Sequence, residues 1–449
     1  MLHIDNIAIA VSCQQYECKR VELDCKKSVA TLHFESSQKT SEVTCPSCGG
    51  QVHTHDWKAI RLKDAPIFPG IAQKLRVMRH RYLCLNCGKT FMEDLGVLRY
   101  PGSMITQRAA AVIRQLLMFH IPESAVSSML NIRWNTVQKV HLEYMNELLK
   151  KRREEQEKAG YRPKHLAIDE FAIHRGHTYA TCVMDLDEGD VIWAGMGRTL
   201  ERFRKFFEET DPDMLSEVNA VAMDMNASYS KLVAQYLPKA AIVYDRYHMQ
   251  AQFGKDVLGS VRLEEAREHR MRALSLDEQR TGQSDPMIRR ELKNQAAAER
   301  HAYSSIKGSR WNLLMSADRL SPEREDSLGV ILRNHARLSV CYAMKEEMCE
   351  LFELRDPEEA RKGWTDWFQA AKESGIPQLV HFAELKEKRI EGLISHATFP
   401  ISTGKLEGFN NKIKVAKRIG YGFRNNEYFF TLIKYLSLPQ IRGRTHTFC

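Results

Sequence analysis

Hydrophobic and polar residues follow three different patterns along the chain. The segments 52–66 (VHTHDWKAIRLKDAP) and 73–84 (QKLRVMRHRYLC) have the composition and alternation of β-strands. From 104 to 150, apolar residues recur at the spacing of amphipathic helices. From 162 to 245, short apolar runs are separated by turns and helical segments. We therefore expect a small β-rich module, a helical region and a mixed α/β domain.

In the third region, three of the apolar runs end in an acid: Asp169, Asp224 and Asp245. A strand of this kind is buried and exposes its final acid at the edge of the sheet, where α/β proteins place their sites. Each aspartate taken singly could instead cap the turn or helix that follows. That alternative is weaker when three apolar runs in the same region each end in an aspartate. The predicted strands and helices are 165–169, 179–184, 191–196, 200–209, 218–223, 229–236 and 240–244.

Carboxylates that lie close together repel one another unless a cation neutralises them. Mg²⁺ suits such a site because it binds one or two carboxylates together with substrate phosphate oxygens. A further acid, Glu407, lies far along the chain in the segment 402–414 (STGKLEGFNNKIK), which is typical of a loop entering a helix. On that helix Glu407, Asn410 and Asn411 would share one face. A single glutamate is otherwise most often a surface residue.

Two CxxC pairs, Cys45/Cys48 and Cys84/Cys87, have the spacing of zinc ligands, and a glycine follows each pair. The 35 residues between the pairs exceed a compact zinc motif, but the predicted strands could bring the pairs together. Four thiolates leave no open coordination position, so we expect one structural Zn²⁺ that holds a small domain together.

Basic residues concentrate in two stretches although the net charge of the 449-residue chain is only +9. Residues 51–117 contain 11 Lys/Arg against 4 Asp/Glu, and residues 401–449 contain 9 against 2. Two basic regions suit a protein that contacts DNA, although a solvated surface without a partner remains the alternative. The candidate DNA contacts in these stretches are Lys74, Arg76, Arg79, Arg81, Lys405, Lys412, Lys414, Lys417, Arg418 and Arg424.

The helical region contains a candidate helix-turn-helix. Residues 124–129 and 134–140 form the two predicted helices, joined by a short turn at 130–132. An ordinary helical hairpin would have the same pattern, but the basic cysteine module upstream favours DNA binding. In that geometry the start of the second helix would face the major groove, with Arg133, Asn135, Thr136, Gln138 and Lys139 as candidate contacts.

Several motifs together resemble the DDE transposases of bacterial insertion sequences, specifically the ISL3 family. They are CPSC, CLNC, RHRYLC, IPESAVSSMLNIRWNTV, HLAIDEFAIHRGHTY, AVAMDMNASYSKLVAQYLPKAAIVYDRYHM, KGSRWNLL and STGKLEGFNNKIKVAKRIGYGFRN. The resemblance covers nearly the whole chain. It implies an RNase H-like catalytic fold with Asp169, Asp224 and Glu407 as catalytic residues and Mg²⁺ ligands. Asp245 and His248 fall outside these three positions, and we expect them, with Asn410 and Asn411, to support the site.

The expected fold is therefore multidomain α/β, with a zinc-binding β module, a helix-turn-helix domain and an RNase H-like core interrupted by an all-α insertion. The expected divisions are an N-terminal segment (1–40), the zinc module (41–98), the helix-turn-helix and linker helix (99–160), the first catalytic part (161–249), the helical insertion (250–395) and the second catalytic part with a basic C-terminus (396–449).

We hypothesise that two Mg²⁺ (or Mn²⁺) ions, about 3.5–4 Å apart, support cleavage at the element's ends and joining of the freed 3′-OH to target DNA. The expected partners are terminal inverted repeats, target DNA and a second copy of the chain, in a homodimer or higher oligomer. No signal peptide or apolar span is visible, so we expect a cytoplasmic, nucleoid-associated bacterial protein. The alternatives are a non-catalytic DNA-binding regulator and an RNase H-like nuclease without strand transfer.

Overall fold

The computed structural model describes residues 16–67, 70–100, 102–174, 178–420, 422–423 and 425–442. The chain forms two compact units. Unit 1 comprises Met1–Glu155 and Lys412–Leu436, and unit 2 comprises Gln156–Asn411 and Ser437–Cys449. The three boundaries fall inside the helices α4 (Trp134–Lys158), α16 (Gly404–Ile419) and α17 (Asn426–Ser437).

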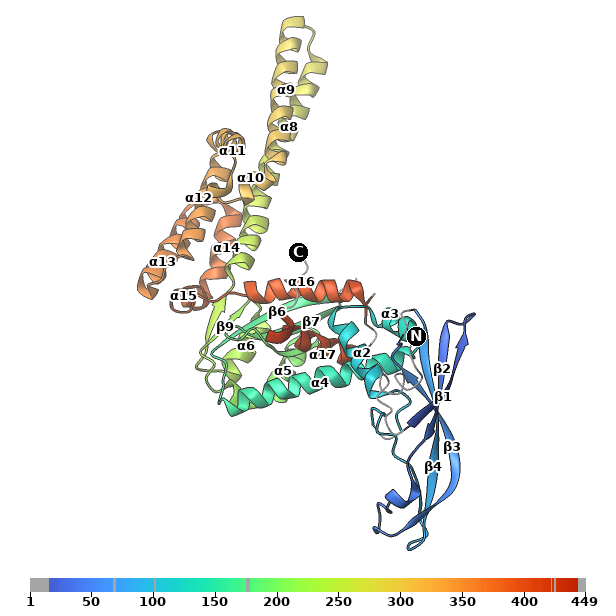
Figure 1. Ribbon diagram of the computed structural model, residues 1–449. Helices are drawn as coiled ribbons and strands as arrows, with labels where there is room; N and C mark the ends of the chain where they lie inside the picture. Colours follow the sequence, from blue (N-terminus) through green and yellow to red (C-terminus); the bar gives the residue numbers. More distant parts are fainter. Residues whose placement is uncertain are drawn as a thin grey trace. The chain divides into compact units, whose positions relative to one another are not determined.

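A five-stranded sheet forms the N-terminal part of unit 1, and its long strands β3 and β4 run side by side (Figure 1). The strand order is β1-β2-β4-β3, with β5 also paired to β4. The two strands predicted from the sequence are present as β3 and β4, and the residues before them add β1 and β2 to the same sheet. The elements are β1 (Tyr16–Asp24), β2 (Val29–Ser36), the 3-10 turn η1 (Thr40–Glu42), β3 (Val52–Asp64), β4 (Ala72–Cys84) and β5 (Thr90–Met92).

The helices of unit 1 are α2 (Gln107–Met118), α3 (Glu123–Leu130), most of α4, the second part of α16, and nearly all of α17. Thr106 caps α2 by accepting a hydrogen bond from the backbone of the third helical residue. The turn between α3 and α4 begins at Asn131, whose φ of 48° ends α3 in the left-handed conformation that asparagine tolerates. Apolar residues of α2, α3 and α4 pack into one buried cluster, including Ile113, Val126 and Val137.

Unit 2 is built on a second five-stranded sheet, ordered β10-β9-β6-β7-β8. Strands β6, β7 and β8 form an antiparallel meander, while β9 and β10 run parallel to β6. The helices α5 and α6 join these strands and bury aromatic and aliphatic side chains against the sheet. The elements are β6 (His165–His174), β7 (Thr178–Asp185), β8 (Val191–Met196), α5 (Leu200–Glu209), η2 (Pro212–Leu215), β9 (Ala220–Met223), α6 (Ala227–Tyr236) and β10 (Ala241–Tyr244).

Between β10 and α16, every described element is helical. A two-helix hairpin of α8 and α9 extends away from the remaining helices of this segment (Figure 1). The elements are α7 (Arg246–Phe253), the π-helical turn η3 (Gly254–Leu258), α8 (Gly259–Gly282), α9 (Pro286–Gly308), α10 (Arg310–Leu314), η4 (Ala317–Arg319), α11 (Pro322–Asn334), α12 (Ala336–Leu351), α13 (Pro357–Glu373), α14 (Pro377–Glu387) and α15 (Ile390–Thr398). A short helix, α18 (Pro439–Arg442), follows α17. Within the described residues, none of the helices has the length and apolar character needed to cross a bilayer.

Candidate functional site

Three aspartates emerge in register at one edge of the unit 2 sheet. In the parallel ladders, Ile168 of β6 is paired with Met223 of β9, which is paired in turn with Tyr244 of β10. The next residue on each strand is an aspartate: Asp169, Asp224 and Asp245. The expectation that three strand ends present acids at one edge therefore agrees with the register.

The expected end of the first of these strands was wrong, because β6 continues to His174 and Asp169 lies in its middle. Pairing with β7 continues along β6 to His174, whereas pairing with β9 stops at Ile168. Asp169 is thus the first residue of β6 beyond its ladder with β9. Asp169 therefore lies at the edge where β6 is no longer paired with β9, although β6 itself continues to His174.

Asp169 is held by two short hydrogen bonds and is partly buried. The side-chain amide of Asn410 on α16 donates to Asp169 Oδ2 at 2.7 Å, and the backbone N–H of Glu170 donates to Oδ1 at 2.7 Å. Burial raises the pKa of the Asp169 carboxyl to about 6, which the Glu170 N–H and His248 oppose and Glu407 reinforces. A nearby cation would therefore stabilise the ionised form of the Asp169 carboxyl.

His248 lies between the other two candidate catalytic acids. Its Nδ1 is 3.7 Å from Asp224 Oδ2, and its Nε2 is 3.5 Å from Glu407 Oε1. The Asp224 side chain is 56% exposed and that of Glu407 is 41% exposed, so both are open to a substrate. The fold thus brings α7, the end of β9 and the first turn of α16 to one place.

Asp245 is buried and fully hydrogen-bonded. Its Oδ1 accepts from the backbone N–H groups of Tyr247 and His248 at 2.8 and 3.3 Å, which caps α7. Its Oδ2 accepts from the backbone N–H of Thr403 at 2.9 Å and lies 2.7 Å from the Thr403 hydroxyl. Asp245 therefore ties the start of α7 to the residue that precedes α16. The side chain carries out the capping role that the sequence left as the alternative.

Thr403 is a site residue that the sequence analysis missed. It is 1% exposed, and its hydroxyl lies 3.2 Å from Glu407 Oε1 as well as 2.7 Å from Asp245 Oδ2. Its position immediately before α16, four residues ahead of Glu407, is the usual place for a threonine that organises a helix start. That local signal in the STG sequence could have identified it.

The oxygen-rich donor set at this edge suits a hard divalent cation. The amide oxygen of Asn410 is buried and has no hydrogen-bond partner among the described residues, so its lone pairs are not engaged by a donor of the described residues. The residues that bring one ligand atom each within 4.8 Å are Asp245, His248 and Glu407. Because the oxygens of Asp245 already accept backbone and hydroxyl hydrogens, this trio is poorly suited to share an ion. Asn411 of α16 is exposed.

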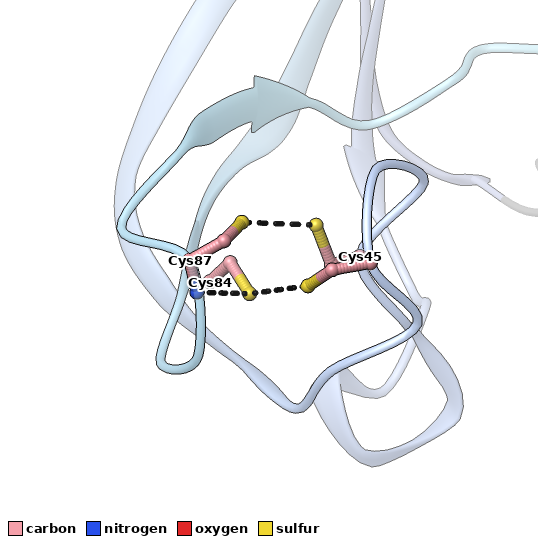
Figure 2. Close-up of side chains that lie close together, drawn as sticks. Cys45, Cys84 and Cys87 are labelled. Atoms are coloured by element: carbon pink, nitrogen blue, oxygen red, sulfur yellow. Dashed lines mark hydrogen bonds between the residues drawn. The ribbon is translucent and has the colours of Figure 1, made fainter.

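The four cysteines of the predicted zinc site lie together at the end of the unit 1 sheet. Their sulfur atoms all lie within 4.8 Å of one another, with Cys45–Cys87 at 3.7 Å and Cys48–Cys84 at 3.5 Å (Figure 2). A tetrahedron of sulfurs around zinc at ~2.3 Å would place them about 3.8 Å apart. The backbone N–H of Cys87 donates to Cys84 Sγ and lowers the pKa of that thiol, favouring the thiolate that binds metal. The geometry fits one zinc ion.

The four basic residues of β4 divide between the two faces of the sheet. Lys74 and Arg76 point outward on one face, whereas Arg79 and Arg81 lie on the other, because β4 is regular and its side chains alternate. Arg81 forms paired hydrogen bonds of 2.9 and 2.7 Å with Asp56, and Arg79 donates to a backbone carbonyl. The four candidates therefore do not form a single stripe.

The outward face instead gains two basic residues from β3. Arg61 is directly opposite Arg76, and Lys63 is directly opposite Lys74. Burial lowers the pKa of Lys63, and the positive charges of Lys74 and Arg133 add to the effect. Like charges opposite each other destabilise a sheet. A polyanion on this face would remove that repulsion.

The candidate contacts at the start of α4 are mostly accessible. Arg133 and Asn135 are exposed, and Thr136 and Gln138 are half-buried. Lys139 is exposed, and its ammonium lies over the ring of Tyr100 at 5.4 Å from the ring centre.

The C-terminal basic candidates have mixed environments. Lys405 donates to the backbone carbonyl of Leu186 at 2.5 Å, and burial lowers the pKa of Lys417. Lys414 and Arg418 are exposed, and Lys412 is half-buried. Arg424 lies outside the described residues.

Comparison with known proteins identifies the family. A family model described as a transposase, of the DDE type and the ISL3 group, matches residues 166–433. Over 423 residues the chain is 32% identical to the transposase for insertion sequence element IS1001 of Bordetella parapertussis, covering 94% of this chain and 95% of that protein. Over 273 residues it is 26% identical to the transposase for IS1557 of Mycobacterium tuberculosis, covering 60% and 59%. This chain therefore belongs to the ISL3 family of insertion-sequence transposases.

Proposed function

We propose that this chain binds the terminal inverted repeats of its element and catalyses metal-dependent DNA cleavage and strand transfer in an RNase H-like domain. The observation that carries the proposal is the common register of β6, β9 and β10, which presents Asp169 and Asp224 at one edge of the sheet. Helix α16 adds Glu407 beside His248. The sheet order, with an antiparallel meander next to two parallel strands, supports the RNase H-like assignment.

Asp169, Asp224 and Glu407 would hold two Mg²⁺ or Mn²⁺ ions. Such ions stabilise the attacking and leaving oxygens of a phosphodiester displacement. Asn410 and the Glu170 N–H orient the Asp169 carboxylate and leave lone pairs on both of its oxygens. Asp245 and Thr403 fix the start of α16 and thereby the position of Glu407.

Two successive displacements at one site account for cutting and joining. In the first, a water oxygen bonds to the scissile phosphorus, the bond to the 3′ oxygen breaks, and that oxygen takes up a proton. In the second, the resulting 3′-OH loses its proton and attacks a phosphorus of target DNA, whose own bond to a 3′ oxygen breaks. Each step replaces one phosphorus–oxygen bond with another, so no covalent protein intermediate is required.

The remaining modules would recognise DNA. The zinc ion would hold the loops of the two CxxC pairs together, and the start of α4 would contact base edges. The outward face of β3 and β4 would contact phosphates. Because an element has two ends, we expect a homodimer or higher oligomer on DNA.

The decisive experiment incubates the protein with labelled DNA that carries the end of its own element, in the presence of Mg²⁺ and target DNA. We expect nicked and strand-transferred products. Asp224→Ala and Glu407→Ala should each reduce both products by at least ~100-fold, since metal-assisted charge stabilisation supplies several kcal/mol. Asp366→Asn, an exposed acid on α13, is the matched control and should retain activity.

The outcomes separate the competing functions. DNA binding without cleavage under any divalent metal would favour a regulator that lacks catalysis. Cleavage without joined product would favour a nuclease. Full activity of either alanine variant would refute the role of that acid.

A further inference from the structure

A pocket of about 570 Å³ adjoins the candidate catalytic edge of unit 2. Asp224 and Met225, which follow β9, line one side of it, and the helical segment after β10, including His248, supplies the rest of the lining. Its volume lies within the ~300–1,000 Å³ that small ligands occupy in proteins. The pocket is therefore large enough for one nucleotide unit.

The floor of the pocket includes a buried ammonium group. Lys386, near the end of α14, is 5% exposed, and its Nζ donates to Gln252 Oε1 at 2.6 Å and lies 3.3 Å from Met225 Sδ. In the described part of the chain, no carboxylate lies within ion-pair distance of Lys386. A buried cation with neutral hydrogen-bond partners is unfavourable, and the carboxylates of Asp224 and Asp256 attract Lys386 only from beyond ion-pair distance. An anionic group bound in the pocket would supply the missing charge.

Two further cations line the same pocket. Arg389 donates to the backbone carbonyl of Met225, which leaves most of its five N–H donors for a ligand. Lys255 is exposed on the π-helical turn η3, and such turns occur frequently at functional sites. Apart from Asp224, the only acid in the lining is Asp256. With Asp224 committed to the catalytic site, the lining is predominantly basic.

We propose that this pocket binds the nucleotide adjoining the scissile phosphodiester, with its backbone phosphate on Lys386, Arg389 and Lys255. This proposal rests on the proposed DNA cleavage function. It makes the helical segment part of the substrate site, because α14, the start of α15 and η3 supply the phosphate contacts. Arg389 also links the bound phosphate to the backbone that follows Asp224, so occupation of the pocket and alignment of that acid are connected.

The test removes the charge of a single phosphate from the DNA and the charge of a single lysine from the protein, separately and in combination. The probe is a duplex with the end of the chain's own element and flanking DNA, carrying a single uncharged methylphosphonate at successive positions around the cleavage site. Cleavage rates in Mg²⁺ are compared for the unaltered protein, Lys255→Gln and Lys386→Gln. Lys362→Gln, an exposed lysine on α13 outside the pocket, is the matched control.

At one position, methylphosphonate should slow the unaltered protein about tenfold or more, as expected for loss of a charge-assisted hydrogen bond. The same substitution should slow Lys255→Gln several-fold less than it slows the unaltered protein, because one of the three cations that contact the phosphate is already absent. Lys362→Gln should keep the full tenfold sensitivity. Lys255 is exposed, so its variant tests the pocket even if Lys386→Gln fails to fold.

The result that overturns the pocket is equal sensitivity of all variants at every position, with the unaltered protein active on unmodified DNA. In that case the proposed function stands and the pocket proposal fails. If the unaltered protein cleaves no element-end DNA, the proposed function fails and this proposal fails with it.

Discussion

Asp169 and Asp245 each come immediately after a row of parallel pairing at the same sheet edge, yet their surroundings differ. The oxygens of Asp245 accept backbone N–H groups on α7 and at Thr403. Asp169 accepts one backbone N–H and one side-chain amide and keeps lone pairs free. These bonds tie Asp245 to the start of α7 and to Thr403, and they leave Asp169 with oxygen lone pairs that suit a cation.

The raised pKa of Asp169 predicts a pH dependence of metal binding. Only the ionised carboxylate binds the ion, so a proton competes as the pH falls through about 6, the value set mainly by burial. Affinity for Mn²⁺, measured by calorimetry, should change little from pH 8 to 7 and fall as much as ~10-fold per unit below pH 6. Asp169→Asn should bind more weakly and lose this step. The same step in that variant would show that another group titrates.

A second prediction at this scale concerns Thr403. Thr403→Val removes the hydroxyl beside Asp245 and Glu407 while keeping the side-chain shape. The free energy of unfolding, measured in urea, should fall by ~1–3 kcal/mol because a buried acceptor loses a donor. The cleavage kcat should also fall, with little change in KM for DNA. Thr403→Ser keeps the hydroxyl and should retain both properties; equal losses in the two variants would contradict the hydroxyl's role.

At the scale of elements, strand β4 shows how regular alternation determines which charges can act together. The step from Arg76 to Arg79 is odd, so the two side chains lie on opposite faces of the sheet. Strand β3 then supplies Arg61 and Lys63 to the face of Lys74 and Arg76. The basic surface is thus a property of two paired strands and not of one segment.

The four clustered cysteines, which lie near the ends of β3 and β4, predict a bound zinc ion that can be measured. The purified protein should contain one zinc per chain, measured by elemental analysis. Cys87→Ser should release it and destabilise the N-terminal sheet by several kcal/mol, since structural zinc contributes ~10–16 kcal/mol of binding free energy in small zinc domains. Cys25→Ser alters an exposed cysteine outside the cluster and should keep both zinc and stability. Zinc retained in Cys87→Ser at full stoichiometry would argue against the site.

At the scale of the whole molecule, the two basic stretches belong to different contexts. Residues 51–117 lie in unit 1 throughout, whereas the second stretch is divided at residues 412 and 436. The second stretch includes Lys405, which is engaged by a backbone carbonyl of unit 2. A positive net charge alone would not distinguish these environments.

The basic face of β3 and β4 predicts a salt dependence of DNA binding. Each phosphate contact contributes about −0.9 to the slope of log affinity against log salt concentration. The double variant Lys74→Gln/Arg76→Gln should therefore make the slope shallower by about 2. Arg81→Gln removes a cation that is already paired with Asp56 and should change the slope little. Equal slopes for the unaltered protein and the double variant would exclude this face from the interface.

Local patterns in the sequence were sufficient for many of the elements and for locating candidate metal-binding groups. Apolar runs identified β7, β8, β9 and β10, and helical periodicity identified α5 and α6, because the period of a pattern reports local backbone geometry. The two CxxC pairs and the acids at the strand ends are also visible in the sequence, because each is defined by residues that are close together in the chain. Family motifs added Glu407, which no local pattern distinguishes from a surface acid.

Only the tertiary structure determined what those residues contact. It extended β6 beyond Asp169, separated Arg79 from Arg76, and gave Asp245 a structural role through Thr403, which is 158 residues away. It also gave the buried ammonium group of Lys386 neutral hydrogen-bond partners in the pocket that Asp224 lines. The physical reason is that hydrogen bonds and burial depend on pairing between distant segments. The sequence by itself determined which side chains carry candidate metal-binding groups; the fold decided which of them are already engaged by hydrogen bonds.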